Sequence, residues 1–377
     1  MGRKTMKAAA ALIAAFILVT ACGGGDQEPT ADDAITLPVD TLAPVLEIGE
    51  EIGDSTTTFA AITAATIDSQ GRIIVVDQAA ACLKVYDMEG SYIRQVSRRG
   101  DGPGEFVMPW DLFTMPDGRL VVVAPGKQGF VVFDDSLDYV EEIALWTQNP
   151  PFYPMALSDS SFVGYKIGQD MRDQTIVMRR TVAIYGWGEE EWDTVLWQDS
   201  LEATMSEIME DPSVFIIDLI DPMSIGGGPA TGIFFSLKDS ESYSVTGWDT
   251  TGTEILSIQR DMTPEEKTPE EMAEESLFVT SYVQRISGGG GMPFEFNPDP
   301  YKDMVVGVDI GPDGNLWVRR GTRNQPFFDI YDLQGSLLRH AVFPDDGWSW
   351  RTEITPRGII AWEDDPPEGY QRLYLLR

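Results

Sequence analysis

Few side chains in this sequence could carry out catalysis, because one histidine, His340, and two cysteines, Cys22 and Cys82, occur among 377 residues. A zinc site built from several histidines is excluded, and a Ser-His-Asp triad would have to use His340. We place His340 on the outermost strand of a predicted sheet and expect it to be a surface residue. Oxygen ligands are plentiful, since Asp and Glu number 61, so a calcium site stays open although we predict no cofactor.

Cys82 lies between two strand-like runs, and no histidine lies near it in the sequence to activate its thiol. We therefore interpret Cys82 as a buried, unreactive thiol rather than a nucleophile. No disulfide framework can form if the other cysteine is modified, as its surroundings indicate.

The N-terminus has the features of an export signal. Arg3, Lys4 and Lys7 precede an apolar run over residues 8–21, which is too short to span a bilayer. The run ends in Val19-Thr20-Ala21-Cys22, which resembles a bacterial lipobox. This resemblance implies a signal peptide over residues 1–21, a lipid-modified Cys22 and a flexible tether over residues 22–44. The alternative is an ordinary cleaved signal followed by a chance cysteine.

A lipid on Cys22 would hold the protein at a membrane of the bacterial cell envelope without crossing it. The residue after Cys22 is glycine rather than aspartate, which in enteric bacteria favours the outer membrane. We expect the protein on the periplasmic side or at the cell surface.

The formal net charge is −34, from 27 basic and 61 acidic residues. A field of this sign repels phosphate backbones, so we expect no nucleic acid partner. We interpret the acidity as a means of keeping the protein soluble, with capture of cations such as calcium as the alternative.

A unit of two hairpins occurs twice over residues 69–134. The turn glycines Gly71 and Gly118 are 47 residues apart, and so are the strand-ending aspartates Asp87 and Asp134. Runs rich in valine and isoleucine follow both turns, which predicts strands. A repeat of this length predicts the blades of a β-propeller.

The linker between the two units reads Gly-Asp-Gly-Pro-Gly-Glu-Phe from Gly100 to Phe106, and Pro109 and three valines at 121–123 follow it. In these features the chain resembles the six-bladed β-propeller lipoproteins of bacterial cell envelopes, which are related to NHL-repeat propellers. The resemblance is closest over residues 59–145. It implies an all-β fold of six four-stranded antiparallel blades, with Phe106 filling the gap between two of them.

Weaker copies of the unit continue to the C-terminus. The distance from the turn glycine to the aspartate is 17 residues from Gly232 to Asp249 and 18 from Gly314 to Asp332, against 16 in the first two units. The third unit is degenerate, and the sixth ends one strand short. We predict that residues 45–49 supply the missing strand, so that the propeller domain comprises residues 45–377 and has no open seam.

Two segments between blades predict helices. Thr263 and Thr268 are each followed by Pro-Glu-Glu, the pattern of a capped helix start, so we expect a helical insertion over about residues 263–287 between the fourth and fifth blades. Ser200 predicts the cap of a short helix over residues 201–209.

The starts of the innermost strands should face the central channel of such a propeller. We call the residues predicted there the ligand mouth: Trp110, Asp111, Phe152, Tyr153, Trp348, Trp350 and Arg351. For each aromatic member, packing between blades is the alternative.

From these features we expect a membrane-tethered, non-catalytic binding module for a small molecule, a glycan or a protein. Two alternatives stay open. One is a calcium-dependent hydrolase acting on lactones or esters, by analogy with gluconolactonase-type propellers, and the other is a structural scaffold of the envelope.

Overall fold

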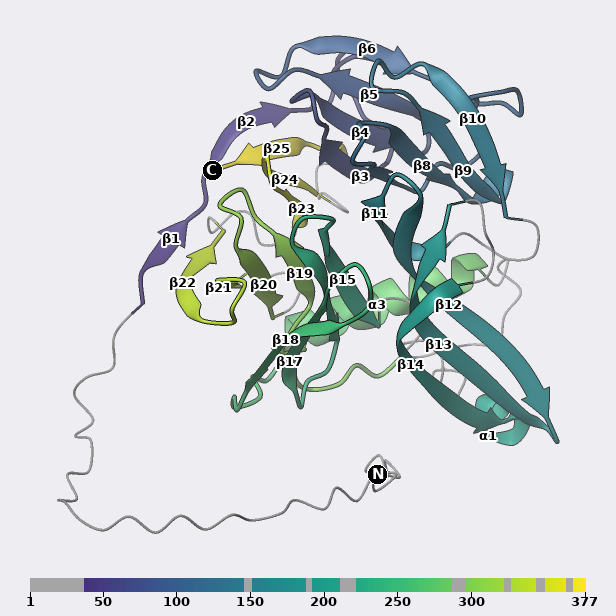
Figure 1. Cartoon of the computed structure of the whole chain (residues 1–377), viewed down its shortest axis with the longest axis vertical. Coiled ribbons are helices and arrows are strands. Elements are labelled where there is room, and N and C mark those ends of the chain that lie inside the picture. Colours follow the sequence, from purple (N-terminus) through teal and green to yellow (C-terminus); the bar gives the residue numbers. More distant parts are fainter. Residues whose placement is uncertain are drawn as a thin grey trace. The chain divides into compact units, whose positions relative to one another are not determined.

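Short runs of β-branched residues, separated by turns that contain aspartate and glycine, form the strands of six sheets. The computed structural model describes residues 37–145, 151–187, 192–210, 222–286, 296–321, 327–343, 350–363 and 369–377. Residues 37–377 belong to one unit, and each sheet within it is one blade (Figure 1).

Blades 1 to 3 follow one another along the chain. Blade 1 consists of β3 (Ile62–Ile67), β4 (Ile73–Asp77), β5 (Cys82–Tyr86) and β6 (Tyr92–Val96). Blade 2 consists of β7 (Asp111–Thr114), β8 (Leu120–Ala124), β9 (Gly129–Phe133) and β10 (Tyr139–Ala144). Blade 3 consists of β11 (Phe152–Ser158), β12 (Ser161–Arg172), β13 (Thr175–Gly186) and β14 (Trp192–Thr204).

Blades 4 to 6 complete the ring. Blade 4 consists of β15 (Met223–Gly228), β16 (Gly232–Leu237), β17 (Tyr243–Trp248) and β18 (Glu254–Arg260). Blade 5 contains β19 (Gly307–Ile310), β20 (Leu316–Arg320), β21 (Phe327–Tyr331) and β22 (Leu337–Val342), and blade 6 contains β23 (Trp350–Thr355), β24 (Gly358–Glu363) and β25 (Leu373–Leu376).

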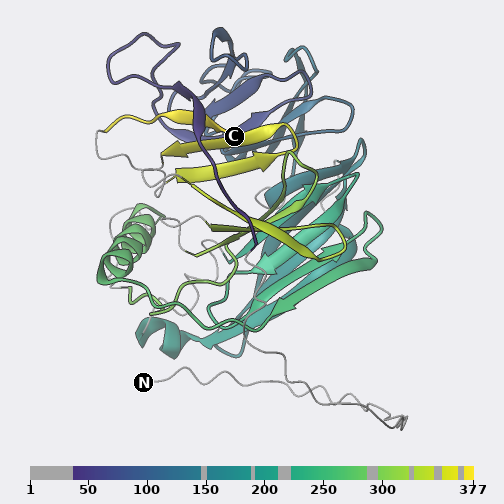
Figure 2. The same cartoon turned by 90° about the vertical axis from the view of Figure 1, so that its left-hand side faces the viewer.

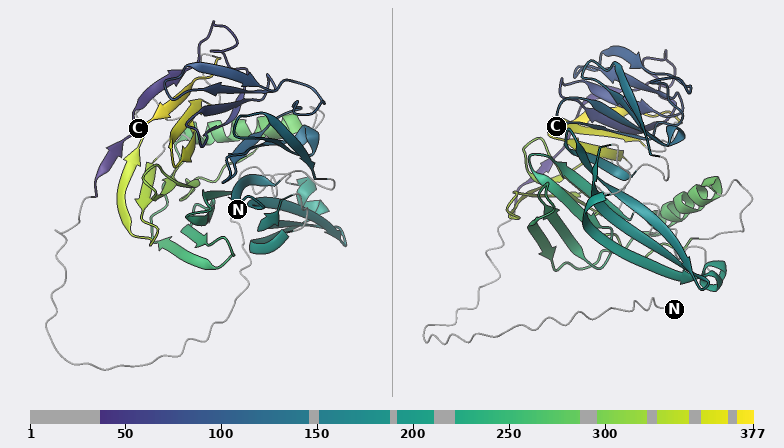
Figure 3. Two further views of the ribbon diagram at one scale, coloured as in Figure 1. Left: turned by 45° about the horizontal axis from the view of Figure 1, so that its top comes forward. Right: turned by 45° about the vertical axis from the view of Figure 1, so that its right-hand side comes forward.

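The first strand of each blade is the innermost one. β3, β7, β11, β15, β19 and β23 each contact the next in this order, and β23 contacts β3. The six inner strands therefore surround one axis, which Figure 3 shows from two further directions. The predicted six-bladed, antiparallel, all-β fold is confirmed.

The outer hairpins recur because one aspartate organises each turn. In blade 1 the Oδ1 atom of Asp87 accepts hydrogen bonds from the N–H groups of Glu89 and Ser91, at 3.0 and 2.7 Å. Asp134, Asp249 and Asp332 accept from the residues two and four positions ahead in the same way. This local turn chemistry explains the regular spacing of glycine and aspartate in the sequence.

The core lies between neighbouring blades. Phe106, at the end of the glycine-rich linker, is fully buried in a cluster shared by blades 1 and 2, and its ring meets that of Phe133 edge-on at 5.8 Å. The predicted filling of the gap by this residue is confirmed. Gly104 in the same linker has φ +70°, and a Cβ atom there would come within 3.0 Å of the Tyr139 ring.

Residues from both ends of the chain close blade 6. β2 (Pro44–Ile48) pairs antiparallel with β25 and forms the outermost strand of this blade, as predicted for residues 45–49. Ile48 is buried in a cluster shared by blades 6 and 1. The ring is thus closed by backbone hydrogen bonds between segments that lie more than 300 residues apart.

Blade 5 differs from the prediction, because it has five strands rather than four. β1 (Val39–Thr41) adds to β22 in parallel, and Asp40 forms an ion pair with Arg339. Leu42, which follows β1 in the sequence, is buried between blades 5 and 6. Residues 37–44, which we assigned to the flexible tether, therefore lie against the last two blades. The remainder of that tether, with Cys22 and the signal peptide, lies outside the described residues.

The predicted helical insertion is present between blades 4 and 5 as α3 (Pro269–Ile286). Thr268 and Glu271 form its capping box, in which the N–H group of each residue donates to the side chain of the other. Thr263 does not begin a helix, because residues 265–267 instead make backbone contacts with residues 300–302.

The short helix α1 (Met205–Glu210) begins later than we predicted from Ser200. Residues 200–204 continue β14, and Thr204 is the cap, since its hydroxyl accepts from the N–H group of Glu207 at 3.2 Å. Both helices lie on the same side of the sheets in Figure 2, at the left of that view. No helix within the described ranges is long and apolar enough to cross a bilayer.

Candidate functional site

The six inner strands bring together carboxylates that the sequence separates widely. We call Asp111 on β7, Asp309 on β19 and Glu353 on β23 the axial carboxylates. All three are half-buried, and the charges of Asp111 and Asp309 both act on Glu353. Three of the six blades therefore contribute an acid to one region of the axis.

Asp111 is the first residue of β7. Burial raises the pKa of its carboxyl group to about 6, against the opposing effects of a hydrogen bond from the Leu112 N–H group at 2.8 Å and of the Arg351 charge. A carboxyl group of this kind changes its charge close to neutral pH rather than in acid.

Asp309 and Glu353 have stronger reasons to hold a proton. Burial raises the pKa of Asp309 well above its usual value, and the Arg319 guanidinium opposes that rise. Burial also raises the pKa of Glu353, and the charges of Asp309 and Asp111 add to the rise. Since Asp309 and Asp111 repel Glu353 once they are ionised, a cation or a hydrogen-bond donor placed beside Glu353 would be stabilised.

Arginines balance part of this negative charge. Arg351 acts on Asp111, and Arg319 acts on Asp309. Arg319 also crosses from blade 5 to blade 6, where its Nη1 atom donates to Thr352 Oγ1 at 3.1 Å. The axial region thus offers both hydrogen-bond acceptors and charged donors on fixed strands.

The residues of the predicted ligand mouth have different surroundings in the structure. Asp111 and Arg351 are the pair within it whose charges interact. Trp110, next to β7, and Phe152, at the start of β11, expose 43% and 40% of their surface. Both rings are therefore accessible to a ligand.

Two other members of the ligand mouth are placed differently. Tyr153 is half-buried and stacks on Tyr165, with ring centroids 6.4 Å apart. Trp350 stacks on Tyr374 at 4.2 Å and is buried in a cluster shared by blades 5 and 6, so it packs between blades, which was our alternative interpretation. Trp348 lies outside the described residues.

Sequence reasoning missed Asp309 and Glu353. Each is an acid whose two neighbours in the inner strand carry no charge: Val308 and Ile310 flank Asp309, and Thr352 and Ile354 flank Glu353. The charge of each residue is the feature of the sequence that could have identified it as a site residue, because carboxylates are rarely buried without a partner.

Comparison with known proteins agrees with this architecture. Residues 62–180 match the model of a family described as 6-bladed beta-propeller. The chain is a six-bladed β-propeller. No curated protein matches its sequence.

Solved structures resemble this propeller at low sequence identity. A candidate exported protein from Bacteroides fragilis is 10% identical, with a TM-score of 0.50 over 91% of this chain and 99% of that one. The calcium-binding protein regucalcin from Agrobacterium tumefaciens is 13% identical, with a TM-score of 0.40 over 90% and 96%. Virginiamycin B lyase from Staphylococcus aureus is 12% identical, with a TM-score of 0.40 over 89% and 99%.

The single histidine of the propeller is not the surface residue that we predicted. His340 lies on β22, which β1 covers, and its side chain is 17% exposed. Its Nδ1 atom lies 2.8 Å from Oδ1 of Asp329, a carboxylate with no exposed surface on the neighbouring strand β21. The prediction was wrong because we expected β22 to be an edge strand, whereas β1 pairs with it.

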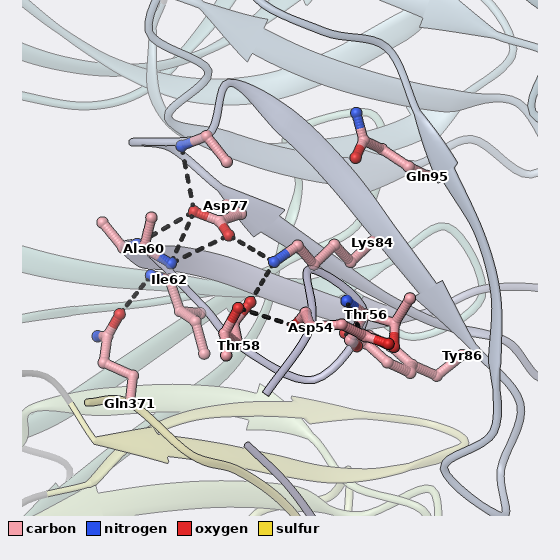
Figure 4. Close-up of polar contacts among 12 residues, drawn as sticks. Asp54, Thr56, Thr58, Ala60, Ile62, Asp77, Lys84, Tyr86, Gln95 and Gln371 are labelled. Carbon is pink, nitrogen blue, oxygen red and sulfur yellow. Dashed lines mark hydrogen bonds and ion pairs between the residues drawn. The ribbon is translucent and has the colours of Figure 1, made fainter. Parts of the chain in front are cut away.

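A second buried acid organises blade 1. Asp77, at the end of β4, forms an ion pair with Lys84 at 2.9 Å and accepts hydrogen bonds from the N–H groups of Ala60 and Ala61 (Figure 4). Lys84 also donates to the carbonyl oxygen of Thr58. These contacts fix the segment that connects β2 to the inner strand β3, and so connect the closing strand of blade 6 to blade 1.

Cys82 is 1% exposed, which confirms a buried thiol. Burial is the main cause that raises its pKa to about 11, and the Asp77 charge adds to the rise while Lys84 opposes it. Within the part of the chain that the structure describes, no group of three or more His, Cys, Asp or Glu side chains is placed to hold a metal ion.

Proposed function

We propose that this propeller is a lipid-anchored binding protein of the bacterial cell envelope, which holds its ligand around the axial carboxylates without transforming it. The convergence of Asp111, Asp309 and Glu353 from three blades carries the proposal. Carboxylates on three rigid inner strands suit a ligand that presents several hydroxyl or amine groups. A small molecule, a glycan or the side chains of a protein partner would meet this requirement.

The exposed rings of Trp110 and Phe152 support a ligand with an apolar face as well. Aromatic side chains that remain exposed beside polar groups are favourable contact surfaces, because they lose little conformational freedom on binding. Binding is favoured over catalysis because His340, the one histidine, lies on β22 against Asp329 rather than on an inner strand.

The binding proposal is tested by titrating the full chain in detergent with a panel of oligosaccharides, amines and envelope extracts. We expect a ligand from this panel to lose affinity by about tenfold or more in Asp309→Asn and Glu353→Gln, since each replaces a carboxyl group that can ionise beside a bound donor by an amide that cannot ionise. Asp193→Asn is the matched control, because Asp193 is an exposed acid on β14. Equal affinity in all variants would show that the ligand binds elsewhere.

The same preparation separates the two alternatives. Saturable calcium binding together with turnover of lactones or esters would replace the binding role by the calcium-dependent hydrolase. Capture of one abundant envelope protein, unaffected by Asp309→Asn and Glu353→Gln, would favour the structural scaffold.

The lipobox supports the anchoring part of the proposal. Cys22→Ala should abolish labelling by a palmitate analogue and move the protein from the membrane fraction to the soluble fraction. Cys82→Ala is the control, and we expect it to leave both labelling and fractionation unchanged. Membrane association that persists in Cys22→Ala would contradict the anchor.

A further inference from the structure

Two arginines from neighbouring blades converge on one buried oxygen atom. Nη1 of Arg260, at the end of β18, lies 2.8 Å from Oδ2 of Asp329, and Nε of Arg320, at the end of β20, lies 3.1 Å from the same oxygen. These two nitrogen atoms are consequently no more than about 6 Å apart. The two guanidinium groups therefore lie close to one another, with these inner nitrogen atoms held by Asp329.

The charges around Asp329 do not balance. Asp329 supplies one negative charge, whereas Arg260 and Arg320 supply two positive charges and are always protonated. Across the described parts of the chain, Asp329 is the one acid that forms an ion pair with either of them. The cluster therefore carries excess positive charge in a chain whose net charge is −34.

Both guanidinium groups are held in place and partly open to solvent. Arg260 lies over the Tyr243 ring at 5.2 Å, and Arg320 lies over the Phe327 ring at 4.2 Å. Their side chains nevertheless remain 32% and 24% exposed. An arginine has five N–H donors, and the contacts with Asp329 and with the Tyr331 hydroxyl use only some of them. Preorganised donors of this kind bind an anion at a small entropic cost.

We propose that Arg260 and Arg320 form a binding site for an oxyanion, meaning a carboxylate, sulfate or phosphate group, at the boundary between blades 4 and 5. The planar fork of each guanidinium matches two oxygen atoms of such a group. Buried Asp329 is the positioning residue: it fixes the inner edges of both arginines and leaves their outer edges to the ligand. The site is separate from the axial carboxylates and does not depend on the function proposed for them.

The test titrates the full chain with inorganic phosphate, sulfate and acetate, using calorimetry at constant ionic strength maintained with sodium chloride. We expect saturable binding of one oxyanion per chain with a dissociation constant on the order of 1 mM, because the acidic chain opposes the approach of any anion. The order of affinity among the three probes identifies the chemical group. Absence of saturable binding by all three would overturn the proposal without any variant.

Variants assign the binding to this pair. Arg320→Gln should weaken binding by about tenfold or more through the loss of a charged donor, and Arg320→Lys should weaken it less, because the charge remains while the fork is lost. Arg172→Gln removes the same charge from a side chain that is 68% exposed on blade 3, and we expect no change. Near-ultraviolet circular dichroism confirms that each variant is folded. Equal weakening by Arg172→Gln, or full affinity in folded Arg320→Gln, would refute the site.

Discussion

Asp111 should make the stability of the propeller depend on pH, and replacing this residue should remove that contribution. Burial raises the pKa of this carboxyl group to about 6 in the folded chain, against 3.8 as the ordinary value for an unfolded one. The folded chain therefore retains the proton more tightly. Below pH 3.8 the Asp111 carboxyl group is protonated in both the folded and the unfolded chain, so its burial imposes no penalty. As pH rises from 3.8 to about 6, this group ionises in the unfolded chain first, and the free energy of unfolding therefore falls.

The size of this loss follows from the shift. A difference of about two pKa units corresponds to about 3 kcal/mol of unfolding free energy, at 1.4 kcal/mol for each unit. Asp111 is half-buried, so water screens part of the effect and we expect about 1–2 kcal/mol. Asp111→Asn cannot ionise and retains an oxygen that accepts from the Leu112 N–H group. The variant should thus gain about 1–2 kcal/mol relative to the wild type between about pH 4 and pH 7.

Urea unfolding of the wild type and Asp111→Asn across this pH range measures the difference directly. Asp193→Asn is the control, because it removes an exposed acid, and its difference from the wild type should stay within about 0.5 kcal/mol. A difference for Asp111→Asn that shrinks as pH rises would mean that the ionised carboxylate stabilises the fold. That result would refute our description of the axial region as one that penalises negative charge.

Three further predictions concern stability and reactivity. Asp77→Ala leaves Lys84, which is 4% exposed, without its counter-charge, and it should lower the free energy of unfolding in urea by about 3–5 kcal/mol. If the effects of Asp77→Ala and Lys84→Met add within about 0.5 kcal/mol in a double-mutant cycle, the two side chains are not coupled. Iodoacetamide should modify Cys82 only after unfolding, since the thiol is 1% exposed and its pKa is about 11; modification of the native protein at the rate of a free thiol would contradict this. Thr268→Ala should lower stability by about 1 kcal/mol through loss of the α3 cap, while Thr263→Ala, at the matching sequence pattern without a helix, should have little effect on the melting temperature.

The blades could be predicted from sequence because the information that forms them is local. Asp87 and Gly90 organise a turn within five residues, and the copies of this turn preserve the spacing. The closing strand β2 could also be predicted, since a ring of sheets with one strand missing at one end requires it from the other. β1 gave no such signal. Its three residues have no apolar alternation, and Asp40 meets Arg339 299 positions away.

The site was harder to predict than the fold, because strand position alone does not tell which way a side chain points. Trp350 and Arg351 are consecutive on β23, and consecutive residues of a strand face opposite sides of the sheet. Both were assigned to the ligand mouth, yet the structure buries Trp350 against Tyr374. Asp309 and Glu353 were missed because their uncharged neighbours in the sequence do not indicate which side chains of the inner strands face the axis.

The pairing of β2 with β25 determines when the ring can close during synthesis of the chain. β25 is made after the strands of blades 1 to 5, so β2 waits without its partner while those blades are made. Until then β2 exposes an unpaired edge, and an unpaired edge invites pairing with a strand of another nascent chain. Truncation at either terminus should therefore affect solubility during expression before it affects the structure of the remaining blades.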